Sequence, residues 1–322
     1  MRSFAARHWF LIVLALGLVA AFVVPEPLGY LTQYWEPNIA VGLSLFLIAW
    51  TMPGGSLVAE MRRPFASLWA VILSYGLVPV SASLLGTLAP EDVRVGLVLV
   101  ACVPCTLSSA VLWTRLAGGD EATALLAVMG TTFTSWFLTT ALLFWLTGAE
   151  VELDIGDMMV KLVATLILPV IVGQGLRRIP ACSHFAQRHK TAFGVVSQFL
   201  ILAIVLKAGV SAGEKLHAGG LSEAPVIFLW SVVLAVALHL FAVFAGIWSG
   251  RLLGFSAGQQ IAIAFAASQK TLPVSLMLYD QYFKPQFPYA VLPLLSYHVG
   301  QLLLDTLIAR RMARASTHHV GN

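Results

Sequence analysis

The stretch Phe265-Ala-Ala-Ser-Gln-Lys-Thr-Leu-Pro273 decides how this chain folds. It lies inside an apolar run from about residue 256 to 279, yet residues 268–271 are four polar residues in a row and include Lys270. A lysine at the centre of a membrane helix costs about 2.5–3.5 kcal/mol on insertion scales, and Pro273 removes a backbone donor. Such a segment is tolerated in hydrocarbon only where protein buries it or where it lines a wet cavity. We therefore expect a broken membrane helix that carries part of a binding site.

The composition places the chain in a bilayer. Its 322 residues are 59% hydrophobic and 11% charged, whereas soluble domains carry about 25% charged residues. The net charge of +4 does not indicate a nucleic-acid partner, because the basic residues alternate with apolar runs along the chain. The lipid bilayer is the partner that this composition predicts.

Ten apolar runs have the length of a membrane span, about 20 residues. The first could be a signal peptide, but it is long for one and ends at Pro25-Glu-Pro27, so we expect a retained span. The predicted spans are residues 8–24, 38–58, 65–88, 93–116, 120–147, 157–176, 191–212, 224–250, 256–281 and 287–309.

The distribution of basic residues predicts the orientation. Thirteen lysines and arginines fall at the two termini and in alternate loops, and only four fall in or near the other loops. Because cytoplasmic loops carry the excess of positive charge, both termini are predicted to be cytoplasmic. The expected location is the inner (cytoplasmic) membrane of a bacterium, as a multi-pass protein.

The acidic loop at residues 148–156 divides the ten spans into two sets of five. An odd number of spans inverts the second set relative to the first, which is the arrangement of many secondary transporters. We expect residues 1–150 to form the first inverted repeat and residues 151–322 to form the second.

The fourth span of each half is interrupted by polar residues. In the first half it holds Val103-Pro-Cys-Thr-Leu-Ser-Ser-Ala110. Interrupted segments at corresponding positions of two halves are the best sequence indication of a transport site, although a proline kink with hydroxyls bonded back to the helix is the alternative for each segment alone. The candidate substrate and ion residues are Pro104, Thr106, Ser108, Ser109, Thr131, Thr132, Ser268, Gln269, Lys270, Thr271 and Pro273.

The neutral oxygens in this set suit a small cation, and the expected sodium ligands are Thr106, Ser108, Ser109 and Gln269. Lys270 has three possible roles: it binds a substrate carboxylate or sulfate, it occupies the place of a cation as a tethered charge, or it accepts and releases a proton. The structural alternative is a lysine that reaches the membrane interface. Apart from sodium as a possible coupling ion, no cofactor is expected.

Further polar residues in the predicted spans have simpler interpretations. Gln301 and Asp305 lie four residues apart and so share one helical face, and Asp305 is expected to pair with Arg310. His239 and His298 are expected to form hydrogen bonds between helices. The pair Cys102 and Cys105 has CxxC spacing but no partner histidine or second pair nearby, so both are expected to be small buried residues.

The chain resembles the bile acid:sodium symporter family, and in particular its SBF-like bacterial branch. The resemblance rests on ten spans, on Pro104-Cys-Thr-Leu-Ser-Ser109, on Ala117-Gly-Gly-Asp120 and on Ser268-Gln-Lys-Thr-Leu-Pro273. It implies an all-α fold with a panel domain and a core domain, in which discontinuous fourth and ninth spans cross at their unwound centres.

The sequence departs from the sodium-coupled relatives at three positions. Ala110 and Lys270 stand where the relatives have asparagine, and Phe265 stands where they have glutamate. The acidic sodium ligand is therefore missing and a cation is present in its neighbourhood. The family implies sodium symport, whereas these residues indicate sodium-independent or proton-coupled transport.

We expect a secondary-active transporter of a small organic solute, an organic anion, which works by alternating access as a monomer or weak homodimer. A channel is disfavoured because the chain has no filter-like sequence or rings of charge. An enzyme is disfavoured because no catalytic motif is present, and a ligand sensor without transport is the remaining alternative.

Overall fold

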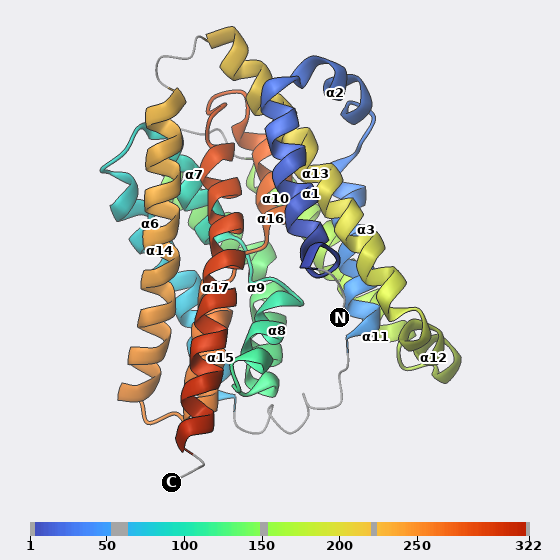
Figure 1. Ribbon diagram of the computed structural model, residues 1–322, viewed down its shortest axis with the longest axis vertical. Helices are drawn as coiled ribbons and strands as arrows, with labels where there is room; N and C mark the ends of the chain where they lie inside the picture. Colours follow the sequence, from blue (N-terminus) through green and yellow to red (C-terminus); the bar gives the residue numbers. More distant parts are fainter. Residues whose placement is uncertain (1–3, 53–63, 149–153, 220–223, 320–322) are drawn as a thin grey trace.

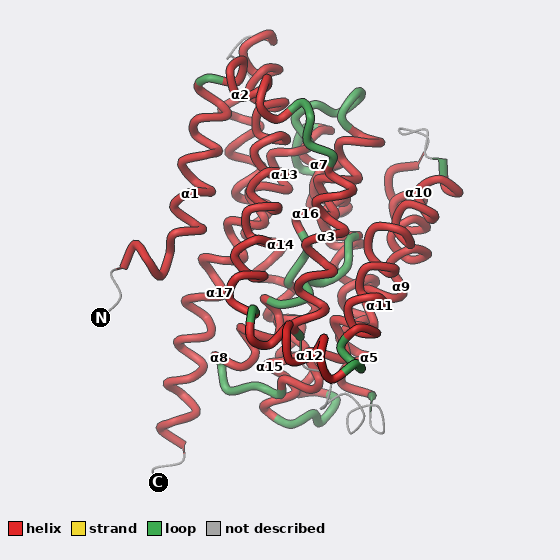
Figure 2. The backbone as a smooth tube through the Cα atoms, turned by 90° about the vertical axis from the view of Figure 1, so that its right-hand side faces the viewer, coloured by secondary structure: helices red, strands yellow, loops and turns green. Residues whose placement is uncertain are grey.

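The computed structural model describes residues 4–52, 64–148, 154–219 and 224–319, and every regular element in these ranges is a helix. Figures 1 and 2 show long helices joined by short loops. The predicted all-α class is confirmed for the part of the chain that the structure describes.

The helices follow one another in this order: α1 (Phe4–Val23), α2 (Pro25–Thr32), α3 (Pro37–Thr51), α5 (Phe65–Ile72), η1 (Leu73–Leu77), α6 (Val78–Gly86), α7 (Glu91–Cys102), α8 (Ser109–Leu116), α9 (Glu121–Thr147), α10 (Ile155–Leu162), η3 (Val163–Ile167), α11 (Leu168–Leu176), α12 (Pro180–Arg188), α13 (Lys190–Gly219), α14 (Ala224–Leu252), α15 (Ala257–Ser268), α16 (Leu272–Leu278), η4 (Tyr279–Phe283) and α17 (Val291–His319).

Seven helical stretches of the described chain are long and apolar enough to cross a membrane, and each coincides with a predicted span. The protein is therefore a multi-pass membrane protein. The seven stretches are Phe65–Gly86, Glu121–Thr147, Ile155–Leu176, Lys190–Glu214, Pro225–Leu252, Ala257–Phe283 and Val291–Ala313.

The other three predicted spans have a different form. The first corresponds to α1, which is followed by α2 at an angle of 114° and counts as an eighth span if the bent pair is one span. The second corresponds to α3, a shorter apolar helix, and the last residues predicted for it lie outside the described residues. The fourth is divided into α7 and α8. The count of ten spans stays a prediction.

The helices form two groups. In the flanking layer, which we define as α1, α3, α10–α11 and α13, α13 packs between α1 and α3, and α3 packs against α11. In the main bundle, which we define as α5–α6, α7–α8, α9, α14, α15–α16 and α17, α14 packs against both α15 and α17. The two groups meet where α10 contacts α9 and where α3 and α13 contact α16.

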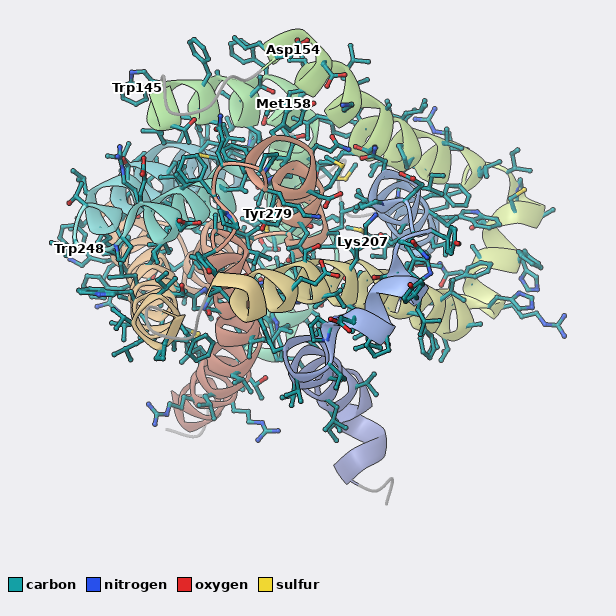
Figure 3. All side chains as sticks on the ribbon, turned by 90° about the horizontal axis from the view of Figure 1, so that it is seen from above. Trp145, Asp154, Met158, Lys207, Trp248 and Tyr279 are labelled. Atoms are coloured by element: carbon teal, nitrogen blue, oxygen red, sulfur yellow. The ribbon has the colours of Figure 1, made fainter. Side chains whose placement is uncertain are left out.

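The broken helix α15–α16 lies at the centre of the molecule. Of its most apolar window 94% is buried, against 28–50% for the other six long spans. Its close neighbour α14 approaches at Gly246, where a Cβ atom would lie 2.6 Å from the Cα of Ala264. By contrast, Trp145 and Trp248 project from the periphery in Figure 3 and are 71% and 55% exposed, as expected for side chains that face lipid.

Three wide π-helical turns lie within or at the end of the spans in the described residues, and each turn ends two residues before a proline. The turns η1, η3 and η4 precede Pro79, Pro169 and Pro285. Proline has no N–H, and its ring collides with the carbonyl four residues earlier. A π-turn relieves this conflict because a backbone bond reaches back five residues, as from Val78 N–H to the oxygen of Leu73. The first and third of these turns carry polar side chains to the regions described below.

Candidate functional site

The two broken helices meet at their breaks. Backbone N–H of Thr271 donates to the oxygen of Pro104 over 3.1 Å, and the preceding Val103 is extended (φ −79°, ψ 159°), as is favoured before proline. In Figure 1, α7 lies above α8 whereas α15 lies below α16, so the two broken helices run through the molecule in opposite directions. The structure therefore brings the two interrupted motifs of the sequence together.

Lys270 is buried at this meeting point, with 1% exposure. Its Nζ atom lies 2.8 Å from both the backbone oxygen and the Oγ of Ser74, and 3.2 Å from the backbone oxygen of Val103. It also lies 5.6 Å from the ring centre of Tyr75. All three acceptors are neutral oxygens, and no ion pair joins Lys270 to a carboxylate among the described residues. The ammonium group is thus surrounded by uncharged groups. Removing it from water is costly, and the three oxygens that accept from it offset this cost.

Ser74 and Tyr75 belong to the site although no sequence motif marks them. Both lie in η1, where the extra residue of the π-turn presents Ser74 Oγ and the Ser74 carbonyl to Lys270. Tyr75 is fixed by a 2.9 Å bond from its hydroxyl to the oxygen of Thr131. Pro79 is the sequence signal that could have identified them, because each of the three π-turns described above ends two residues before a proline.

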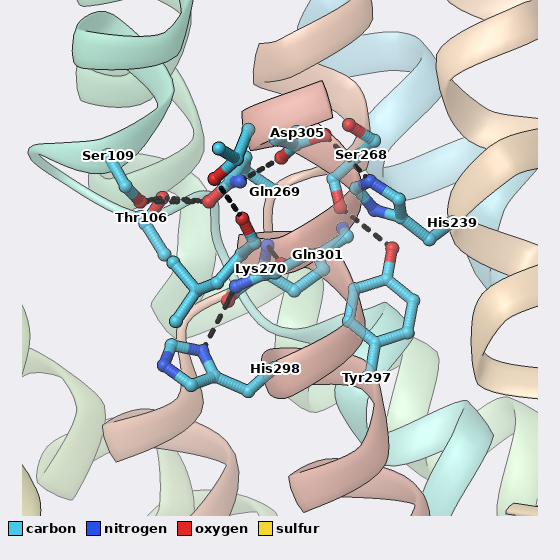
Figure 4. Close-up of polar contacts among 12 residues, drawn as sticks. Thr106, Ser109, His239, Ser268, Gln269, Lys270, Tyr297, His298, Gln301 and Asp305 are labelled. Atoms are coloured by element: carbon cyan, nitrogen blue, oxygen red, sulfur yellow. Dashed lines mark hydrogen bonds and ion pairs between the residues drawn. The ribbon is translucent and has the colours of Figure 1, made fainter. Parts of the chain in front are cut away.

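Gln269 connects the two breaks through its side chain (Figure 4). Its Oε1 atom accepts from Thr106 Oγ1 at 3.0 Å and from Ser109 Oγ at 2.8 Å. The two hydroxyl oxygens are 2.5 Å apart. On the other side, Gln269 Nε2 donates to Asp305 Oδ2. Three of the four predicted sodium ligands therefore lie together, but they bind one another.

The fourth predicted ligand, Ser108, is exposed and precedes α8 as its N-cap residue. Thr131 reaches the break because its Oγ1 accepts from the backbone N–H of Cys105 at 3.3 Å. The hydroxyl of Thr132, by contrast, donates at 2.8 Å to the oxygen of Val128 in its own helix, which is an ordinary packing role. Cys102 and Cys105 are free and buried, as expected.

Asp305 does not contact Arg310, so the expected pairing with Arg310 is wrong. It is fully buried and forms a 2.8 Å contact with Nε2 of His239, which is also fully buried. Residues five apart on a helix point to different faces, and Arg310 is exposed while Asp305 faces the breaks. The expectation of a hydrogen bond between helices is confirmed for His239 and wrong for His298, which contacts Gln301 of its own helix.

Two more residues of α17 hold the backbone of the α15–α16 break. Gln301 accepts from the N–H of Lys270 and donates to the oxygen of Lys270, both at 3.0 Å, and it also contacts His298 Nδ1 at 3.0 Å. Tyr297 donates to the oxygen of Ser268 over 2.7 Å. These contacts replace the helical hydrogen bonds that the break removes, so the opened backbone is a fixed feature.

A cavity of about 490 Å³ lies between the flanking layer and the breaks. The main bundle lines it with Thr106, Ser108, Ser109, Thr271, Pro273 and His298. The flanking layer contributes Ser44, Thr51 and Gln198. Charged side chains line the part of the cavity beyond the start of α8: Arg115, Glu121 and Lys190. Lys270 and Gln269 are not among its lining residues. The cavity reaches the exposed Arg115, which forms a 2.5 Å ion pair with Glu121.

At the other end of the molecule polar contacts join the two groups of helices. Tyr282 in η4 donates at 2.6 Å to Asp157 in α10, which also pairs at 2.6 Å with Lys161. Gln281 in η4 donates at 2.7 Å to Asn38 in α3. We call these five residues the polar seam. The two groups are thus joined near α10, whereas residues of α8, which lies toward the other end in Figure 1, line the cavity.

Comparison with known proteins shows similarity over nearly the whole chain. The model of the SBF-like CPA transporter family matches residues 8–314. An uncharacterized protein of Pseudomonas aeruginosa is 28% identical, covering 97% of this chain and 94% of that protein. The probable sodium/metabolite cotransporter BASS4 of Arabidopsis thaliana is 27% identical, covering 97% of this chain and 74% of that protein. The sodium/bile acid cotransporter 7 of Danio rerio is 29% identical, covering 66% of this chain and 63% of that protein.

Proposed function

The chain belongs to the SBF-like CPA transporter family, and we propose that it is a sodium-independent carrier of a small organic anion in which Lys270 takes the place of the coupling cation. The family is one of transporters, not of enzymes, and named relatives are cotransporters. The observation that carries the proposal is the position of the Lys270 ammonium group, which is enclosed by three neutral oxygens at 2.8–3.2 Å.

The surroundings of Lys270 resemble those of a bound cation. Val103 follows directly after the C-terminal end of α7, where unpaired carbonyls carry partial negative charge and favour a cation. In broken transporter helices such carbonyls coordinate the coupling ion. Here one of them accepts from a lysine, which supports the tethered-charge role among the three that the sequence left open. Because Lys270 does not line the cavity, its geometry gives less support to direct binding of a substrate carboxylate.

The predicted sodium ligands fit a free ion less well. The hydroxyls of Thr106 and Ser109 and the Oε1 atom of Gln269 are already bound to one another within their cluster. The buried ammonium group of Lys270, which follows Gln269 in the chain, would also repel a second cation bound at this cluster. Sodium symport is the second candidate function, since two of the relatives carry sodium in their names.

The cavity supports an anionic substrate. Its volume of about 490 Å³ lies within the range of small-molecule sites, about 300–1,000 Å³. Ser108 and Ser109 place the start of α8 in its wall, where the first backbone N–H groups have no partner within the helix. Lys190 adds positive charge beyond that point, where Arg115 is paired with Glu121. An organic carboxylate or sulfate fits this set of donors.

We propose ten spans in two inverted repeats, residues 1–150 and 151–322, with both termini in the cytoplasm of a bacterium and the protein in its inner membrane. The opposite directions of α7–α8 and α15–α16 support the inversion. The flanking layer and the main bundle are the proposed panel and core domains, and movement between them gives alternating access. The polar seam at one end and the cavity toward the other are the arrangement expected of an inward-facing state.

The test is transport by purified protein in liposomes, with taurocholate and a panel of smaller mono- and dicarboxylates as probes and with sodium or choline as the cation. We expect uptake of at least one anion that is independent of sodium. Uptake that requires sodium would instead support the symporter. Binding of an anion without uptake would support the sensor that the sequence left as an alternative.

A further inference from the structure

Asp305 and His239 form a buried pair that has no role in the proposed coupling. Asp305 nevertheless binds Gln269, whose side chain contacts the cavity-lining hydroxyls of Thr106 and Ser109. An ionised carboxylate accepts hydrogen bonds and cannot donate them. Gln269 must therefore turn its NH2 group toward Asp305 and its oxygen toward Thr106 and Ser109, which is the arrangement observed. The orientation of this carboxamide is fixed by the chemistry of its partner.

The orientation of Gln269 decides what Thr106 and Ser109 offer to the cavity. Each hydroxyl has one hydrogen, and both hydrogens are used inside the cluster, on Gln269 Oε1 or between the two hydroxyls. Both residues line the cavity, so only oxygen lone pairs remain for a ligand. The two side chains are therefore acceptors on the cavity side.

His239 stabilises this state from the other side of Asp305. Its Nε2 lies 2.8 Å from Asp305 Oδ1, and its buried Nδ1 has no hydrogen-bond partner among the described residues. A neutral imidazole with its hydrogen on Nε2 leaves only a lone pair unpaired at Nδ1. Asp305 thus accepts from a histidine and a glutamine at once, one on each carboxylate oxygen.

We propose that Asp305 is a positioning residue that sets the hydrogen-bonding preference of the cavity. Acting through Gln269, it makes Thr106 and Ser109 acceptors, so the transported anion carries a hydroxyl or amide N–H donor near its charged group. This inference rests on the proposed function and narrows its substrate class. The charged group binds near the start of α8 and the donor binds the two hydroxyl oxygens, because Ser109 is the first residue of that helix.

The test uses matched ligands that differ at one position: 4-phenylbutyrate, its 2-hydroxy derivative and its 2-methoxy derivative, measured by calorimetric titration of the purified protein. The hydroxyl can donate and the methoxy group cannot. We expect the 2-hydroxy acid to bind about two- to tenfold more tightly than either of the others, which is the range that one neutral hydrogen bond supplies. Equal binding of all three, or preference for the methoxy compound, would overturn the inference.

The variant Asp305→Asn separates a positioning role from a structural one. With the asparagine oxygen toward His239, its NH2 group faces Gln269, and the glutamine carboxamide must turn over. Thr106 and Ser109 then accept from Gln269 and present hydrogens to the cavity, so the preference for the 2-hydroxy over the 2-methoxy acid should disappear or reverse. An unchanged ratio in a folded variant would overturn the proposal.

Two further variants complete the design. Gln269→Leu leaves the Asp305–His239 pair in place but removes the acceptor of the Thr106 hydroxyl, so a hydroxyl hydrogen becomes free for the cavity. This variant should lose the same preference if Asp305→Asn does not fold. Asp280→Asn is the control, because Asp280 pairs with Lys284 at a partly exposed site in η4 and its loss should leave the ratio unchanged.

The neutral methyl esters of the three acids distinguish this inference from the proposed function. If the esters show the hydroxyl preference and the acids do not bind, the anion proposal fails and the positioning role stands. If neither series binds, both fail. Sodium also binds oxygen lone pairs, so a sodium requirement for binding of the 2-hydroxy acid would assign the two hydroxyls to the ion and overturn the inference.

Discussion

The Nζ atom of Lys270 and the Ser74 residue that binds it are 196 positions apart in the sequence, and they are joined by two 2.8 Å hydrogen bonds. The bonds connect a helix break to a π-turn in another span. A lysine that reaches a membrane interface is thereby excluded in this structure, because the side chain is buried and its three acceptors all lie in the protein interior.

Replacement of Lys270 should stop transport while the protein remains folded. In Lys270→Met the side chain keeps its approximate volume and loses the charge that the three oxygens bind, so we expect anion uptake into liposomes to fall at least tenfold. Lys284→Met, which removes a partly exposed lysine paired with Asp280, is the control and should transport normally. Uptake by Lys270→Met at the rate of the unmodified protein would rule out a coupling role for this residue.

The double variant Thr106→Val with Ser109→Ala should weaken ligand binding. It removes two oxygens that line the cavity and leaves Gln269 Oε1 without its two donors. The loss should amount to about 1–3 kcal/mol of binding free energy, the cost of unsatisfied buried polar groups.

Titration of taurocholate or of the best transported carboxylate measures this loss. Thr140→Val is the matched control, since the Thr140 hydroxyl donates to Trp136 O in its own helix and lies away from the cavity wall. If the double variant and this control bind the ligand with the same affinity, the hydroxyls of Thr106 and Ser109 act only in packing.

The π-turn η1 should be needed for transport, whereas η3 should not. Pro79→Ala restores a backbone donor and allows the span to close into a regular helix, which would rotate Ser74 away from Lys270. We expect transport to fall severalfold without loss of folding.

Pro169→Ala is the internal control for this prediction, because the same change affects the equivalent turn η3, which supplies none of the oxygens that bind Lys270 Nζ. Transport rates of the two variants, with melting temperatures measured in parallel, decide the question. Equal effects on transport would show that the proline turns act only through stability.

The polar seam should hold one end of the molecule closed. Tyr282→Phe removes the hydroxyl that bridges η4 and α10, and the loss of one such bond, about 1 kcal/mol, changes a conformational equilibrium about fivefold. We expect the variant to populate the opposite-facing state more than the unmodified protein. Distances between spin labels on α10 and α14 would report the shift, and identical distance distributions would argue against a closing role.

The breaks could be predicted from the sequence, but not all of their partners could. The run from Ser268 to Pro273 identified its own interruption, because four polar residues and a proline cannot continue a regular helix that faces lipid. It did not identify Ser74, since the register between distant spans depends on the π-turn before Pro79. Asp305 was assigned to the wrong partner because an arginine nearby in sequence is an obvious counter-ion, whereas helix geometry turns the carboxylate inward to His239.

The thermal stability of the purified protein, with sodium compared with choline, tests the role of Lys270 most directly when the unmodified protein and Lys270→Asn are measured side by side. An ion that binds the folded state stabilises it by about 2.7 kcal/mol at a hundredfold excess over its Kd. If Lys270 replaces the coupling cation, sodium should stabilise only Lys270→Asn, in which the vacated oxygens of Ser74 and Val103 can bind the ion. Stabilisation of the unmodified protein by sodium, with none in Lys270→Asn, would contradict this role for the lysine.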